Sequence, residues 1–274
     1  MLDALDHNAK KHAPPGNGLG VALVTGGRRG IGRAICLELA HRGYDIAFVD
    51  WVEDHHVERT LSILASTGRK AAYFPLDIAK VDRHDEIVNT VWEQLGPITC
   101  LVNNAGIQVS VRGDMLEVDE AELDRLLSVN LRGTFFLTQL VAKKMVEVAA
   151  SAPDVVRSII TITSANAHLV SPEKAAYCIS KAALSMAMQA YAVRLAEHGV
   201  RVYEIRPGLI ETDMTAEVYD RYSPGMLDGS LCALRRWGKP DDIAGAIATL
   251  ATGAMPYSTG DIYNIGGGMQ IPRL

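Results

Sequence analysis

The 274-residue chain has few cysteines, no excess of positive charge and no long hydrophobic run. These features argue against a disulfide-rich protein, a nucleic-acid-binding protein and a membrane-spanning protein, respectively. Its four cysteines, Cys36, Cys100, Cys178 and Cys232, are far apart and match no CxxC or other metal-ligand spacing. We therefore expect buried free thiols in a protein of the reducing cytoplasm. The formal net charge of -5 lacks the basic excess with which proteins bind phosphate backbones, so we expect no nucleic-acid partner.

The hydrophobic residues, 48% of the chain, are distributed in short runs. No run reaches the roughly 18 apolar residues of a membrane-spanning helix, so we expect no membrane partner. Residues 1–18 are polar and turn-forming and contain no apolar stretch of the kind found in signal peptides. We expect them to form a flexible leader and residues 19–274 to form a single catalytic domain, because α/β folds commonly exceed about 200 residues as one unit.

From Leu19 on, short β-branched runs alternate with longer helical patterns, which is typical of a parallel sheet with crossover helices. The predicted strands are Val21–Thr25, Asp45–Val49, Lys70–Phe74, Ile98–Val102, Arg157–Thr163, Val200–Ile205 and Asp261–Asn264. The predicted helices are Ile31–His41, Val52–Ser66, Arg83–Leu95, Glu120–Ala149, Glu173–Glu197 and Pro240–Ala251. The pattern predicts an α/β, single-domain Rossmann fold: a doubly wound seven-stranded parallel sheet with helices on both faces.

The segment Asp213–Trp237 interrupts this alternation, because it mixes aromatic residues with Pro224, Gly225 and Gly229 and has no clean period. A long irregular stretch in a packed domain is commonly a functional loop. We therefore expect this segment to be a lid that closes over the substrate.

A glycine-rich turn, Thr25–Gly32, follows the first predicted strand and opens the first helix. Glycines at such a turn let the backbone approach a pyrophosphate, which the helix N-terminus then binds. Asp50 ends the second predicted strand, where a carboxylate can accept hydrogen bonds from both adenosine ribose hydroxyls. The alternative for Asp50 is an ordinary helix N-cap. Together the two features predict a dinucleotide site.

Tyr177 and Lys181 lie four residues apart in a helical pattern and therefore share one face. A Tyr hydroxyl ionises near pH 10, and an ammonium about 5 Å away would lower that pKa toward the range that proton transfer needs. The pair alone is also compatible with a surface contact. Ser164 strengthens the functional interpretation, because it follows a predicted strand at the sheet edge where ligands bind.

With these residues in place, the sequence resembles the short-chain dehydrogenase/reductase family from about Val21 to the C-terminus. Six ordered motifs carry the resemblance: glycines 26, 30 and 32; Leu76-Asp77-Ile78; Asn103-Asn104-Ala105-Gly106; Asn130 in Ser128-Val129-Asn130; Ser164 with Tyr177 and Lys181; and Arg206-Pro207-Gly208-Leu209-Ile210-Glu211-Thr212. The resemblance implies hydride transfer between a nicotinamide cofactor and a ketone or secondary alcohol.

The resemblance also implies residue roles. Tyr177 is the general acid/base, Lys181 lowers its pKa and binds the nicotinamide ribose, Ser164 binds the substrate oxygen, and Asn130 holds a relay water. Thr212 holds the nicotinamide carboxamide. The predicted cofactor-binding residues are Gly26, Arg28, Arg29, Gly30, Ile31, Gly32, Asp50, Asp77, Ile78, Asn104, Ala105, Gly106, Tyr177, Lys181, Pro207, Gly208, Ile210 and Thr212. We expect Asn104 to be largely structural.

Within the family the general pattern is nearest to 3-oxoacyl-acyl-carrier-protein reductases. Two departures argue against a carrier-protein partner: His198 ends the Tyr-bearing helix where Arg is often found, and Glu147–Asp154 replaces a basic helix end. The alternative is an NAD-dependent dehydrogenase of a small sugar, polyol or hydroxy acid. A non-catalytic dinucleotide sensor is a further alternative, which the intact catalytic set disfavours.

The remaining expectations concern the cofactor, the pocket and assembly. We expect NAD to be preferred because Asp50 faces the place of a 2′-phosphate, although Arg28 and Arg29 leave NADP open. Gln108, Arg112 and His168 are candidates for the pocket wall, and His55-His56 is interpreted as the start of a solvated helix, with no metal site. By resemblance, and from the long apolar helical patterns, we expect a homotetramer.

Overall fold

A computed structural model describes residues 18–272 of the chain. The expected leader lies outside the described residues, apart from Gly18. Seven parallel strands form one sheet in the order β3-β2-β1-β4-β5-β6-β7. The strands are β1 (Val21–Thr25), β2 (Asp45–Asp50), β3 (Ala71–Pro75), β4 (Ile98–Asn103), β5 (Arg157–Ile162), β6 (Val200–Pro207) and β7 (Ile262–Ile265). The predicted fold class is confirmed, with each strand within two residues of its expected bounds.

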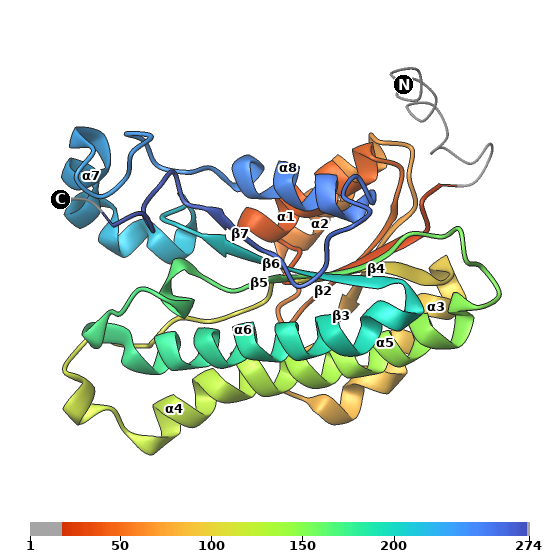
Figure 1. Ribbon diagram of the computed structural model, residues 1–274, viewed down its shortest axis with the longest axis horizontal. Helices are drawn as coiled ribbons and strands as arrows, with labels where there is room; N and C mark the ends of the chain where they lie inside the picture. The colour runs from red at the N-terminus through yellow and green to blue at the C-terminus, as the bar shows by residue number, and fades with distance from the viewer. Residues whose placement is uncertain (1–17, 273–274) are drawn as a thin grey trace, which may run out of the picture.

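The helices cover both faces of this sheet (Figure 1). They are α1 (Gly30–His41), α2 (His55–Ala65), α3 (His84–Leu95), α4 (Glu120–Leu127), α5 (Thr134–Ala149), α6 (Ala175–Leu195), α7 (Tyr219–Asp228) and α8 (Pro240–Ala251). Alternate residues of β1 point into two separate cores, since Ala22 and Val24 join the core beneath α1 and α8, whereas Val21 and Leu23 join the one beneath α3, α5 and α6. Apolar burial on both faces thus explains the uninterrupted hydrophobic strands.

The expected single helix Glu120–Ala149 is wrong in one respect. A turn of π-helix, Ser128–Gly133, separates α4 from α5. Gly133 packs here against the backbone of Ile78, where a Cβ would lie 2.3 Å from the carbonyl oxygen. Hydrophobic periodicity does not detect such a turn because one extra residue barely disturbs it, yet π-turns often mark functional positions.

The segment Asp213–Trp237 is more regular than expected. It contains a 3₁₀ turn, Asp213–Val218, followed by α7, which includes Pro224 and ends before Gly229. Proline inside a helix removes a hydrogen bond and predicts a break. The helix persists because Met226, Cys232 and Trp237 form a small core with Tyr222, Leu231, Leu209 and Met269, so tertiary packing overrides local propensity.

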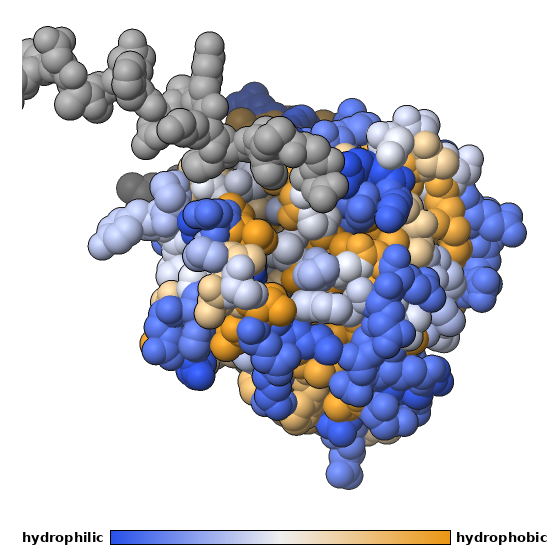
Figure 2. All heavy atoms as spheres, turned by 90° about the vertical axis from the view of Figure 1, so that its right-hand side faces the viewer, coloured by the Kyte–Doolittle hydropathy of each residue, from blue (hydrophilic) through white to orange (hydrophobic). Residues whose placement is uncertain are grey.

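The strand order reverses between β1 and β4, which places a crevice at the carboxyl ends of the strands, on the side where α7 lies. Figure 2 views the opposite side, where hydrophobic residues are interspersed with hydrophilic ones in the part that the grey atoms leave visible. Scattered apolar residues of this kind are normal on a protein surface. No helix among residues 18–272 is long and apolar enough to cross a membrane.

The cysteines differ slightly from expectation. Cys36, Cys100 and Cys232 are buried. Burial raises the pKa of the Cys36 thiol, and it raises the pKa of Cys100 to about 12. Cys178 is only half-buried, because it lies near the N-terminus of α6, where its neighbour Ile179 is exposed. All four are free thiols, as predicted.

Candidate active site

A cavity of about 540 Å³ lies at the carboxyl ends of the strands and runs from the glycine turn to Tyr177. Its size is typical of a ligand pocket. The structure brings every predicted cofactor-binding residue to its wall: Gly26, Arg28, Arg29, Gly30, Ile31, Gly32, Asp50, Asp77, Ile78, Asn104, Ala105, Gly106, Tyr177, Lys181, Pro207, Gly208, Ile210 and Thr212. Ser164 also lines it, whereas Asn130 does not.

The glycine turn requires glycine for two different reasons. Gly26 and Gly30 have φ values of +68° and +55°, which other residues rarely adopt. At Gly32, a Cβ would lie only 2.0 Å from the Gly26 carbonyl oxygen. The first turn of α1 therefore packs tightly against the end of β1 and presents bare backbone to the cavity. This cradle fits a bound pyrophosphate.

Asn104 connects this turn to the neighbouring strand. Its Nδ2 donates to the carbonyl oxygens of Thr25 (2.9 Å) and Gly26 (3.0 Å), and the Thr25 hydroxyl accepts from the backbone N–H groups of Asn104 and Ala105. The side chain therefore fixes backbone geometry at the switch point, consistent with a structural role.

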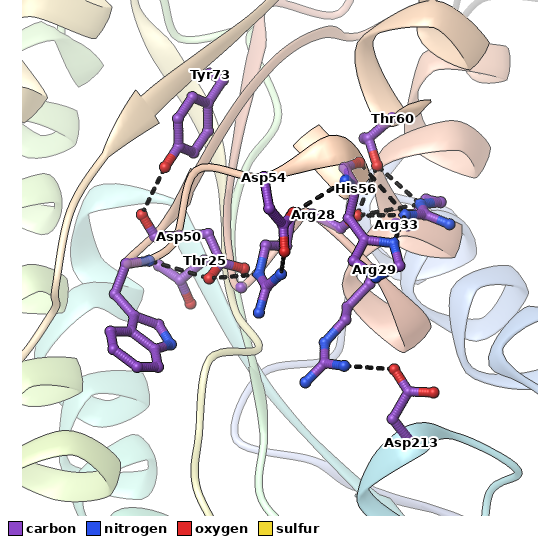
Figure 3. Close-up of polar contacts among 12 residues, drawn as sticks. Thr25, Arg28, Arg29, Arg33, Asp50, Asp54, His56, Thr60, Tyr73 and Asp213 are labelled. Carbon is purple, nitrogen blue, oxygen red and sulfur yellow. Dashed lines mark hydrogen bonds and ion pairs between the residues drawn. The ribbon is translucent and has the colours of Figure 1, made fainter. Parts of the chain in front are cut away.

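Two acids pair with Arg28 at the end of the cavity that the glycine turn forms. Arg28 is buried, its Nε donates to Asp50 Oδ1 at 3.1 Å, and its Nη1 donates to Asp54 Oδ2. Figure 3 shows the guanidinium lying between the two carboxylates. The N-cap of α2 is Asp54, whose side chain accepts from the His56 backbone, so the N-cap alternative for Asp50 is wrong. Asp50 remains at the cavity wall.

Arg29 makes a separate contact across the cavity. Its Nη1 donates to Asp213 Oδ2 at 2.5 Å, joining the glycine turn to the start of the segment Asp213–Trp237 (Figure 3). Both arginines of the turn thus have acidic partners. The sequence places these residues far apart and gave no signal for either pairing.

His55 and His56 begin α2, as expected. Ligand atoms of Asp54, His55 and His56 lie within 4.8 Å of one another, a spacing compatible with a metal ion. However, Asp54 is paired with Arg28, and His56 Nδ1 lies 3.2 Å from Arg33 Nη2. Two guanidinium groups beside the cluster disfavour a bound cation.

Tyr177 and Lys181 are both buried, one turn apart on α6. Lys181 Nζ lies 5.8 Å from the centre of the Tyr177 ring and donates to the Ile162 carbonyl oxygen at 3.2 Å. Burial raises the pKa of Tyr177, while the polar Ser164 hydroxyl and the charge of Arg112 lower it. Overall the pKa of Tyr177 is raised, because desolvation is the largest influence on it. This is opposite to the lowering that the sequence predicted from Lys181. Burial also lowers the pKa of Lys181, to about 8.

Asn130 lies in the π-turn and is fully buried. Its Oδ1 accepts from the Ile107 N–H at 2.8 Å, and its Nδ2 donates to the Ile107 carbonyl (2.9 Å) and to Ser180 Oγ (3.1 Å). The amide therefore holds the backbone after Gly106. At Gly106 a Cβ would lie 3.1 Å from Lys181 Nζ and 3.2 Å from Asn130 Oδ1, so this glycine brings the backbone close to both.

A buried acid that we did not predict lies on β6 behind Lys181. Glu204 is 2% exposed and accepts from Thr163 Oγ1, Ser185 Oγ and Arg206 Nε, each at 2.6 Å. Its charge raises the pKa of Lys181 against the effect of burial. A glutamate inside a strand of otherwise apolar character is the signal that could have revealed it.

The wall near Tyr177 contains two of the three candidate pocket residues, Gln108 and Arg112, but not His168. From the segment Asp213–Trp237, Met214 and Tyr222 reach the cavity, whereas Tyr219 stacks on Trp237 with ring centres 4.7 Å apart. Among the wall residues that sequence reasoning missed are Arg125, Asn166, Lys174 and Met269.

Comparisons with known proteins agree with this geometry. Residues 20–223 match the sequence model of the family described as short chain dehydrogenase. A 3-oxoacyl-[acyl-carrier-protein] reductase of Staphylococcus epidermidis is 33% identical over 250 residues, which span 91% of this chain and 98% of the relative.

Solved structures give the same result. A 3-oxoacyl-[acyl-carrier protein] reductase from Brucella melitensis in complex with NAD is 44% identical with a TM-score of 0.87, and the match covers 93% of this chain and 98% of that one. A putative gluconate dehydrogenase from Agrobacterium tumefaciens is 29% identical with a TM-score of 0.86 and the same coverage. The chain therefore belongs to the short-chain dehydrogenase family of nicotinamide-dependent oxidoreductases, and it resembles the 3-oxoacyl-acyl-carrier-protein reductases.

Proposed function

We propose that this protein interconverts a secondary alcohol and a ketone, with Tyr177 as the group that exchanges a proton with the substrate oxygen. The observation that carries the proposal is the grouping of Ser164, Tyr177 and Lys181 on one wall of the cavity whose other end is the glycine turn. When bound, the nicotinamide supplies the hydride acceptor or donor. In the oxidation direction the alcohol carbon loses hydride, its oxygen loses a proton to Tyr177, and a ketone results.

The other residues prepare Tyr177 for this proton transfer. The Ser164 hydroxyl lowers the pKa of Tyr177 and can bind the same substrate oxygen. Lys181, buried one turn away, stabilises the phenolate electrostatically when protonated. Asn130 fixes the backbone after Gly106 through its two hydrogen bonds to Ile107. We propose that its Oδ1, which lies close to Lys181 across Gly106, also holds the relay water. This set supports catalysis over the alternative of a dinucleotide sensor.

We assign the preferred cofactor as NAD. Asp50 lines the ribose end of the cavity, and the acids Asp50 and Asp54 together outweigh the single charge of Arg28. A 2′-phosphate placed there would meet a net negative group, which repels it. Arg29, the other arginine of the turn, is directed to Asp213. The NAD complex of the Brucella melitensis relative supports the same assignment.

The relatives' names suggest two substrate classes: 3-oxoacyl thioesters from the reductases and hydroxy acids from the putative gluconate dehydrogenase. We do not extend the proposal to a carrier protein, because the last turn of α5 contains no basic residue that could bind an acidic partner. We further propose Asp213–Trp237 as the substrate lid, supported by Met214 and Tyr222 at the cavity wall.

A substrate panel tests the proposed activity. Purified protein is assayed by nicotinamide absorbance with 3-oxoacyl thioesters, polyols, sugars and hydroxy or oxo acids, with each of the two cofactors. We expect turnover of at least one class, abolished in Tyr177→Phe. Turnover that survives this substitution would contradict the proposed role of Tyr177.

A further inference from the structure

Two positively charged side chains, Arg112 and Lys174, lie at the substrate end of the cavity, and the described acids around them do not pair with both. Arg112 and Lys174 line the cavity near Tyr177, from the loop after β4 and from the turn before α6. Lys174 Nζ lies 5.4 Å from the centre of the Tyr177 ring, about as near as Lys181 at 5.8 Å. The charge of Arg112 also acts on Tyr177, since it lowers the pKa of that hydroxyl. Both cations are therefore neighbours of the reacting group.

The hydrogen-bonding capacity of these cations is largely unused. Arg112 donates from Nε to Glu217 Oε1 at 2.9 Å, but its Nη1 is buried and has no partner within residues 18–272. In that same range, Lys174 Nζ has no hydrogen bond or ion pair, and its contact is with the Tyr177 ring. Burial and the charge of Arg112 both lower the pKa of Lys174. A buried donor without a partner costs free energy unless a ligand satisfies it.

The nearby acids are committed elsewhere. Glu173, adjacent to Lys174, accepts at both oxygens from Arg221 at 2.8 and 3.0 Å. The acids on the described cavity wall are Asp50, Asp77 and Asp213. Asp50 and Asp213 pair with the arginines of the glycine turn, and Asp77 accepts from the Ala79 N–H. Among the described residues, Glu217 therefore offers one carboxylate to the two positive charges at the substrate end of the cavity, and Lys174 has no ion-pair partner.

We propose that Arg112 and Lys174 form a subsite for a carboxylate carried by the substrate itself, so that the substrate is a short hydroxy or oxo acid. The inference rests on the proposed function, because it requires the reacting oxygen to lie at Tyr177. With the oxygen there, an acid group only a few bonds away reaches Lys174 and the free Nη1 of Arg112. Charge-assisted hydrogen bonds of this kind are among the strongest available to a ligand.

A thioester substrate fits this end of the cavity less well. Its sulfur and carbonyl oxygen carry no charge, so they would leave Lys174 and the buried Nη1 of Arg112 without an anionic partner beside Tyr177. An unpaired lysine beside an arginine with one unsatisfied nitrogen favours ligands that bring an anion. The contrast gives the proposal a direct test in matched pairs of acids and esters.

Binding can be measured without turnover in Tyr177→Phe saturated with NAD. Isothermal titration compares lactate, 3-hydroxybutanoate and 3-hydroxyhexanoate with their methyl esters, which keep the hydroxyl and lose the charge. We expect at least one acid to bind at least about tenfold more tightly than its ester, the equivalent of about 1.4 kcal/mol. Adding Arg112→Gln or Lys174→Gln should reduce that preference to below about threefold.

Glu217→Gln is the matched control, because it removes the lid partner of Arg112 and leaves the guanidinium in place. It should retain the preference for the acid. Equal binding of acid and ester in all three pairs, or loss of the preference in Glu217→Gln to the same extent as in Arg112→Gln, would overturn the proposal. Tyr177-dependent turnover of neutral substrates alone would refute the carboxylate subsite and leave the proposed function intact. Tyr177-independent turnover, by contrast, would refute that function.

Discussion

Glu204 and Lys181 are oppositely charged and both almost fully buried, and the carboxylate of Glu204 raises the pKa of the ammonium that burial would otherwise lower further. The net result is a Lys181 pKa of about 8. Glu204 is itself held by Thr163, Ser185 and Arg206. We infer that this acid is a positioning residue that keeps Lys181 charged near neutral pH.

Replacing this acid should therefore change the pH profile. In Glu204→Gln the ammonium loses its stabilising charge, so Lys181 should release its proton at a lower pH. The alkaline limb of kcat/KM for alcohol oxidation should move downward by about one pH unit. Glu197→Gln, a change to an exposed acid on the surface, is the control. A profile that stays in place while only thermal stability falls would assign Glu204 a purely structural role.

Lys181→Ala tests the electrostatic role of the ammonium directly. Burial already raises the pKa of Tyr177. Removing the ammonium that lies 5.8 Å from the centre of its ring should raise that pKa further. The phenolate then forms only at higher pH, so the pH optimum for oxidation should move upward. The measurement is the initial rate of NAD reduction from pH 6 to about 11. An unchanged optimum would contradict this role.

The π-turn and Glu204 on β6 are features that the sequence patterns did not predict. Strand positions followed from buried β-branched runs, and the glycine turn, Tyr177 and Lys181 followed from spacing, because these depend on neighbours in the chain. Glu204 and Arg112 depend on partners tens of residues away, and their environments arise only when β6 and the lid pack. Likewise, Asn130 was found by motif, but its pairing with Ile107 required the structure.

The preference for NAD over NADP likewise depends on side-chain pairings that the sequence did not reveal. The sequence left Arg28 and Arg29 as evidence for NADP, whereas the structure pairs Arg28 with Asp50 and Asp54, and Arg29 with Asp213. We expect at least about tenfold preference for NAD in kcat/KM, given the repulsion between a 2′-phosphate and this cluster. Asp50→Ser should reduce the preference, since one negative charge is removed. Equal or better use of NADP by the wild type would contradict the assignment.

The outer face of α6 supports the expected homotetramer, which stays a prediction. Ile179, Met186 and Val193 are spaced seven residues apart and are 54%, 64% and 83% exposed, which is unusual for large apolar side chains on one helical stripe. Packing against a second copy would bury this stripe. Light scattering at micromolar concentration should give four times the 29.6 kDa mass of the chain, and Met186→Glu should dissociate the assembly. A monomeric wild type would refute the prediction.

Proton exchange at Tyr177 is the central claim, and single-turnover kinetics of Tyr177→Phe tests it most directly. The substitution removes one hydroxyl from a buried ring, so the fold and the NAD dissociation constant should change little. The rate of the hydride-transfer step should fall by at least about 100-fold, the low end for loss of positioned acid/base catalysis. A variant that binds NAD normally and retains more than about a tenth of the wild-type rate would show that another group transfers the proton.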